Sequence, residues 1–226
     1  MSPRAPYARG THEYARRRPM MPPSGRSFLV VTEGEKTEPN YFEALRERLR
    51  LRTVDVEIVH PKGTDPITLT QRAMELRDQR KKEAKKGNVI EYDEVWVVFD
   101  LEKAHDIRRE QATRAIQMKK AGEIHFARSD PSFEYWLILH FEYTTSPLAD
   151  SDEAEARLRR HWPEYEKCCS PRTEVLDRLP FAVKNAERCR VYQKDAGGDG
   201  NPSTDIDLLA RSLNAATRPH MRFSLS

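Results

Sequence analysis

The chain of 226 residues contains few cysteines, only Cys168, Cys169 and Cys189. An odd number of cysteines, two of them adjacent, does not form the disulfide framework that supports many secreted proteins. We therefore expect reduced thiols. His161 lies nearby in the sequence, but the CxxC and HxxxH spacings that would predict a zinc site are absent.

Long apolar runs are absent as well. No run approaches the roughly 20 residues that a membrane helix needs, and the N-terminus lacks the apolar stretch of a secretory signal. We therefore expect a cytoplasmic protein. Hydrophobic residues make up 38% and charged residues 33% of the chain, which is typical of a soluble folded protein.

The chain has little net charge, +3, which does not by itself predict a nucleic-acid partner. The charge is unevenly distributed, however, because residues 1–26 contain six arginines and one acid, Glu13. We expect residues 1–25 to form a disordered basic tail. Its Arg16, Arg17 and Arg18 are candidates for contacts to nucleic-acid phosphates without sequence preference. A solvated tail with no role is the alternative.

Apolar runs and helical spacings alternate through the first part of the chain. The patterns predict strands over residues 28–31, 54–58, 95–99 and 124–127, with helices between them and an aromatic-rich helix over residues 133–141. This order predicts an α/β fold with an open, mostly parallel sheet flanked by helices. The run at 95–99 is continuously apolar and predicts a central strand, whereas the alternation at 54–58 indicates a half-buried or edge strand.

Beyond Pro147 only helical patterns are found. They predict helices near residues 151–162, 173–194 and 204–215. We therefore expect a core over residues 26–145 and a helical C-terminal extension over residues 146–226, after the tail over residues 1–25.

Acidic residues follow two of the expected strands. Glu33 ends the first, and Asp100 and Glu102 end the central one. Ligands bind at the carboxyl ends of parallel strands, and carboxylates that meet there repel one another unless a cation lies among them. All-oxygen ligands suit Mg²⁺ or Mn²⁺, and such sites support phosphodiester cleavage. The alternative is that these acids only keep the strand ends soluble.

The segment Gly34-Glu35-Lys36-Thr37 has some letters of a nucleotide-binding loop. It lacks the GxxxxGK[ST] spacing, so we expect no NTPase activity from this chain alone. Gly34 lets the backbone turn sharply and approach a phosphate closely. Lys36 is a candidate contact to nucleic acid.

The run of residues 30–42, VVTEGEKTEPNYF, resembles the RloB family of defence-associated bacterial proteins. Further similar blocks are Phe99-Asp100, residues 129–141 and residues 201–204, so the resemblance spans roughly residues 26–215. RloB-like proteins resemble the Toprim superfamily. The resemblance therefore implies a Toprim-like core.

The resemblance also implies roles for particular residues. Glu33 takes the place of the Toprim general acid/base, and Asp100 and Glu102 take the place of its DxD metal pair, with Glu in place of the second Asp. Glu38 takes the place of an acid that could hold a second metal. Two further candidates are Glu134, which could equally pair locally within an aromatic core, and Lys194, a candidate cation for a leaving phosphate that could equally be an exposed helix end.

The implied function is a Mg²⁺- or Mn²⁺-dependent nuclease that acts on RNA, including tRNA, or on DNA in antiphage defence by abortive infection. An ABC-type ATPase encoded nearby is the implied partner. The alternative is a catalytically degenerate Toprim module that senses a nucleic acid or nucleotide for a partner ATPase, because Glu102 departs from the DxD pattern.

Overall fold

The computed structural model describes residues 26–51, 56–59, 65–87, 89–101, 105–118, 121–197 and 200–225. The first part of the chain contains β1 (Phe28–Thr32), α1 (Thr37–Arg48), β2 (Val56–Val59), α2 (Pro66–Ala84), β3 (Glu94–Asp100), α3 (His105–Gln117), η1 (Ala121–Glu123) and β4 (His125–Asp130). The second part contains α4 (Phe133–Ile138), α5 (Ser151–Leu158), α6 (Thr173–Leu176), α7 (Leu179–Ala196), β5 (Ser203–Thr204), α8 (Ile206–Ala216) and η2 (Pro219–Met221).

The strands form one open sheet in the order β2-β1-β3-β4-β5. The β1–β2, β1–β3 and β3–β4 pairs are parallel, and β5 runs antiparallel to β4. The structure therefore confirms an α/β fold with a mostly parallel sheet flanked by helices. It also confirms that β3 is central and that β2 lies at an edge.

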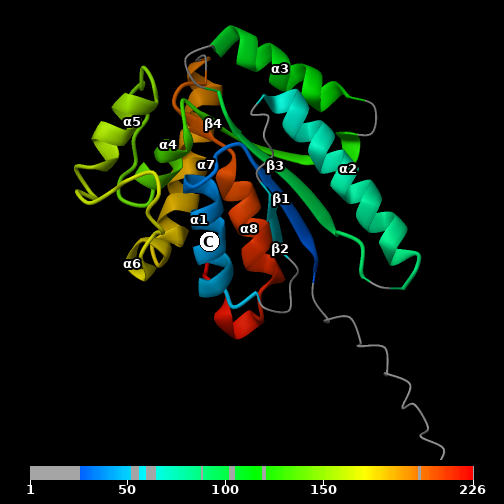
Figure 1. Ribbon diagram of the computed structural model, residues 1–226. Coiled ribbons are helices and arrows are strands. Elements are labelled where there is room, and N and C mark those ends of the chain that lie inside the picture. The colour runs from blue at the N-terminus through cyan, green and yellow to red at the C-terminus, as the bar shows by residue number, and fades with distance from the viewer. Residues whose placement is uncertain are drawn as a thin grey trace, which may run out of the picture.

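Helices cover both faces of the sheet (Figure 1). Successive strand residues point to opposite faces, so Phe28 and Val30 pack in one core and Leu29 and Val31 in the other. The larger core includes residues of α1, α4, α7 and α8, and the smaller one includes residues of α2 and α3. The burial of both faces explains the continuously apolar strands.

The start of α2 shows how local sequence sets an element. Asp65 Oδ1 accepts hydrogen bonds from the backbone N–H groups of Ile67 and Thr68, both at 3.0 Å. Pro66 occupies the first helical position, where its missing N–H costs nothing. The motif fixes where the chain enters the helical layer next to β1 and β3.

The expectation of only helices beyond Pro147 was wrong at β5. A strand of two residues is too short to show an alternating pattern, and it forms because β4 offers an edge for pairing. The helix expected over residues 173–194 is divided into α6 and α7. Pro180 lies in the first turn of α7, where proline is tolerated, and could not continue a longer helix. The expected aromatic helix ends at Ile138 rather than at residue 141.

None of the helices in the described parts of the chain is long and apolar enough to span a bilayer. The division between a core ending at residue 145 and a C-terminal extension stays a prediction. Residues from both sides of that boundary pack in the larger core, among them Phe28 and Leu209.

Candidate active site

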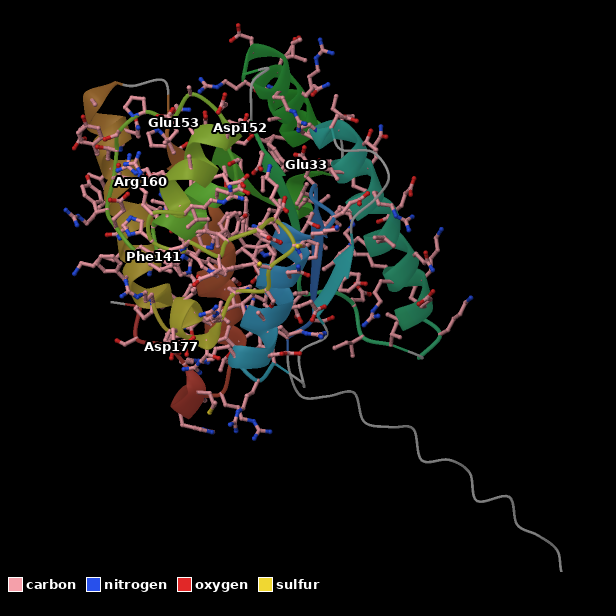
Figure 2. All side chains as sticks on the ribbon, turned by 60° about the vertical axis from the view of Figure 1, so that its left-hand side comes forward. Glu33, Phe141, Asp152, Glu153, Arg160 and Asp177 are labelled. Atoms are coloured by element: carbon pink, nitrogen blue, oxygen red, sulfur yellow. The ribbon has the colours of Figure 1, made fainter. Side chains whose placement is uncertain are left out.

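Glu33 and Asp100 meet at the carboxyl edge of the sheet. Glu33 directly follows β1, and Asp100 is the last residue of β3. These two strands are parallel neighbours in the sheet. The Glu33 backbone N–H donates to the Val98 carbonyl at 3.0 Å, and the Asp100 backbone N–H donates to Glu33 Oε2 at 3.1 Å. Figure 2 shows Glu33 where β1 ends, between α1 and α3. The structure thus brings these two predicted site residues together.

Glu38 joins them from the first turn of α1. Its side chain is buried, and its Oε1 accepts a hydrogen bond from the Gly34 N–H at 3.0 Å. A Cβ atom at Gly34 would lie 2.0 Å from Glu38 Oε2. With the Glu38 carboxylate in this position, only glycine fits at residue 34, so Gly34 admits Glu38. The close approach of Gly34 to a phosphate stays a prediction.

Glu134 is the fourth carboxylate of the cluster. It is buried in α4, where Ser132 Oγ donates to its Oε2 at 2.6 Å and the Tyr165 hydroxyl donates to its Oε1 at 2.8 Å. The local pairing that the sequence offered as one alternative for Glu134 is confirmed, and a role in the site stays a prediction. Glu134 pairs locally with hydroxyl groups, and it also lines a pocket beside Asp100.

These residues line a pocket of about 300 Å³. Glu33, Glu38, Asp100 and Glu134 supply carboxylates, and Lys36 and Lys167 also line the pocket. The pocket therefore combines four acids with two lysines, an arrangement in which the lysines suit an anionic ligand and the acids suit a cation.

Sequence reasoning missed Lys167. Its segment is tied to α1, because Thr37 Oγ1 donates to the Lys167 carbonyl at 2.7 Å and Asn40 Nδ2 donates to the Cys168 carbonyl at 2.8 Å. Nothing in the local sequence signals this contact across about 130 residues, since no motif or periodicity surrounds Lys167.

Two carboxylates of the pocket, Glu38 and Asp100, have a raised pKa. Burial raises the pKa of Glu38 to about 7, and the charges of Glu134 and Glu33 add to the effect. Burial also raises the pKa of Asp100 well above its usual range, with the charges of Glu38, Glu134 and Glu33 adding to it. The cluster is therefore short of positive charge.

Asp100 shows this shortage most directly. The residue as a whole is partly exposed, but its Oδ1 atom is buried and has no hydrogen-bond partner in the described part of the structure. An unpaired buried carboxylate oxygen is costly unless a ligand completes it.

Glu33, one of the four carboxylates, has a cationic partner from α3. Arg108 in α3 forms a bidentate ion pair with Glu33, with Nη1 at 2.9 Å from Oε2 and Nη2 at 2.8 Å from Oε1. Both side chains are mostly buried. Sequence reasoning missed Arg108 too, because it lies in a polar helix with many charged residues and no distinguishing motif.

The remaining predicted residues fall elsewhere. Lys194 is exposed near the end of α7 and does not line the pocket. Glu102 and the arginines Arg16, Arg17 and Arg18 lie outside the described residues. Their predicted roles in metal and phosphate binding stay predictions.

No three Asp, Glu, His or Cys side chains among the described residues are arranged to hold one metal ion. The chemistry of the pocket nevertheless fits a divalent cation, because its donors are carboxylate oxygens and one of them, Asp100 Oδ1, is buried without a partner. Glu33, Glu38 and Asp100 are the residues that would hold it.

A comparison with curated proteins found no match to the chain. The family model described as RloB-like protein matches residues 28–213. The matched region includes the strands of the described sheet and every residue that lines the pocket. Because this match covers most of the sequence and agrees with the motif blocks around Glu33 and Asp100, the chain belongs to the RloB-like family.

Proposed function

We propose that the protein is a Toprim-type nuclease that uses Mg²⁺ or Mn²⁺ to cleave phosphodiester bonds of nucleic acid. The observation that carries the proposal is the pocket at the carboxyl edge of the sheet, where four carboxylates meet and Asp100 Oδ1 lacks a partner. Clefts at this edge are where open α/β sheets bind ligands.

The residues of the pocket have different proposed roles. A bound divalent cation would neutralise phosphate charge and lower the pKa of a water molecule. Glu33, the proposed general acid/base, lies beside Asp100 and would accept or return a proton at its carboxylate. Lys36 and Lys167 would orient the phosphate at the pocket.

Membership of the RloB-like family supports a biological setting for this activity. We propose that the nuclease acts in antiphage defence by abortive infection and is controlled by an ABC-type ATPase encoded nearby. The substrate is RNA, including tRNA, or DNA. The pocket selects for a phosphodiester through charge and does not distinguish these nucleic acids.

The direct test is incubation of the purified protein with total tRNA, single-stranded DNA or supercoiled plasmid in Mg²⁺ or Mn²⁺, with and without the ATPase. We expect cation-dependent cleavage that Asp100→Asn abolishes, because the substitution keeps the shape of the side chain but removes a charge. Asp195→Asn makes the same change at an exposed position of α7 and should cleave normally. Equal cleavage by Asp100→Asn and the parent would exclude Asp100 from the site.

A second function, the degenerate module that binds nucleic acid or nucleotide for a partner ATPase, is favoured by one observation. Arg108 forms an ion pair with Glu33, so Glu33 already has a cationic partner. Such a module would bind nucleic acid equally well in EDTA and in Mn²⁺. A nuclease core should bind Mn²⁺ and lose that binding in Asp100→Asn, so calorimetric titration with Mn²⁺ separates the two.

A further inference from the structure

Arg108 donates hydrogen bonds to both carboxylate oxygens of Glu33, the proposed general acid/base. Its Nη2 atom donates to Glu33 Oε1. Its Nη1 atom donates to Glu33 Oε2, which also accepts from the Asp100 backbone N–H. A guanidinium and a carboxylate joined by two parallel hydrogen bonds form one of the strongest polar pairs in proteins. The side chains are only 18% and 14% exposed, so solvent screens the pair weakly.

The other three carboxylates of the pocket have no such partner in the described structure. Glu38 accepts from a backbone N–H, Glu134 accepts from two hydroxyl groups, and Asp100 Oδ1 accepts nothing. Arg108 therefore provides a single positive charge to a cluster of four acids, and it does so from the side of Glu33. A divalent cation centred among the acids would need the Glu33 oxygens that the guanidinium holds.

We propose that Arg108 and the divalent cation compete for Glu33. In the metal-free protein the guanidinium neutralises Glu33, and the cation gains this ligand only when Arg108 leaves it. The inference rests on the proposed function, because it takes this pocket as the metal site. It adds that Arg108, which lies in the first turn of α3, lowers the metal affinity of the pocket.

The competition has a direct consequence for binding. A ligand that must first break an ion pair binds more weakly by the factor that the ion pair contributes. Removing the guanidinium should therefore tighten metal binding, which is opposite to the effect of removing a ligand. Arg108 is a positioning residue in this scheme, since it acts on the site through Glu33.

The experiment is calorimetric titration of the full, metal-stripped protein with Mn²⁺. We expect Arg108→Gln to lower the Kd for Mn²⁺ by about tenfold, which corresponds to about 1.4 kcal/mol. Arg108→Lys keeps the charge but cannot form the two parallel bonds, and should give a smaller gain. Arg114→Gln is the matched control, because Arg114 lies on the same helix, is 64% exposed and pairs with Glu110. Its Kd should stay within about twofold of the parent value.

Thermal unfolding provides a second readout. In EDTA, Arg108→Gln should melt below the parent because the carboxylates lose their cation, and Mn²⁺ should raise its Tm by more than it raises that of the parent. If Arg108→Gln does not fold, Arg108→Lys carries the test with the same expected direction.

The outcomes separate the competition from the proposed function. An unchanged or higher Kd in Arg108→Gln, with binding still abolished by Asp100→Asn, overturns the competition and leaves the metal site in place. Equal tightening in Arg108→Gln and Arg114→Gln also overturns it, because the effect would then be general electrostatics. Absence of Mn²⁺ binding in the parent and in Arg108→Gln overturns both the competition and the metal site.

Discussion

Glu38 gives the pocket a defined pH dependence. Its pKa of about 7 in the folded protein lies above the ordinary glutamate value, so the folded state holds a proton that the unfolded state has lost. The contribution of Glu38 to the free energy of unfolding is therefore fully present below about pH 4.5. It is lost as the pH rises through about 7. Asp100, whose pKa is also raised, contributes in the same direction.

We expect Glu38→Gln to remove this loss. In EDTA, the free energy of unfolding of the parent relative to Glu38→Gln should fall by on the order of 3 kcal/mol between about pH 4.5 and 8. Urea denaturation at both pH values measures it. Acids distant from the pocket titrate in both proteins and cancel in the difference. Asp100 does not cancel, because on top of burial the charge of Glu38 raises its pKa in the parent, and it adds to the expected fall. A difference that stays constant with pH would show that Glu38 ionises normally in the folded protein.

Gly34 is the second residue whose neighbourhood predicts a measurable effect. Because a Cβ atom there would meet Glu38 Oε2, Gly34→Ala should lower the free energy of unfolding by about 1–3 kcal/mol. Gly122→Ala is the control, since nothing lies within 4 Å of a Cβ at that position. Glu38→Ala should relieve most of the cost of Gly34→Ala in the double variant. An additive double variant would place the clash elsewhere.

At the scale of elements, the segment between α5 and α6 completes the pocket. It carries Tyr165, which donates to Glu134, and Lys167, which lines the pocket and has its Nζ atom 3.9 Å from Glu155 Oε2. We expect Lys167→Gln to weaken nucleic-acid binding about two- to fivefold. The slope of log affinity against log salt should fall by about 0.7–0.9, the value for one phosphate contact.

Lys194→Gln provides the matched comparison for this prediction. Lys194 was expected from the sequence to face a leaving phosphate, but it is exposed and does not line the pocket. Binding titrations of both variants over a range of salt concentrations should show an effect of Lys167→Gln only. A larger effect of Lys194→Gln would return the phosphate-binding role to the end of α7.

The sequence predicted elements better than it predicted contacts between them. The strands β1 and β3 were identifiable because two covered faces require continuous apolar runs, and Glu33 and Asp100 followed from the ends of these strands. Arg108, Tyr165 and Lys167 could not be found this way. Each reaches the pocket through tertiary contacts, and a single charged or aromatic residue carries no periodicity. The break before α7 was detectable, since Pro180 marks it.

At the scale of the whole molecule, phosphate binding by the basic residues 1–25 stays a prediction from the sequence. Deleting residues 1–25 removes five of the six arginines of the segment and leaves the pocket intact. If these arginines bind phosphates, affinity should weaken most at low salt, and the salt slope should fall by about 0.7–0.9 for every phosphate that the tail neutralises. Turnover at saturating substrate should hardly change.

Salt titrations of the full and shortened proteins measure this effect. An identical slope in both would show that the tail binds no phosphates. The lysines in the last turn of α2 and directly after it, Lys81, Lys82, Lys85 and Lys86, would then be the next candidates for this role.

The short strand β5 has a consequence for how the protein is made. It pairs with β4 only once Ser203 and Thr204 have been synthesised. Ile206, Leu209 and Leu213 of the following helix pack in the same core as Phe28 and Val30 of β1. A nascent or prematurely terminated chain that already contains Glu33 and Asp100 therefore lacks much of the core that holds them in place. We expect a chain that ends before α8 to lack the formed pocket and, with it, the proposed activity.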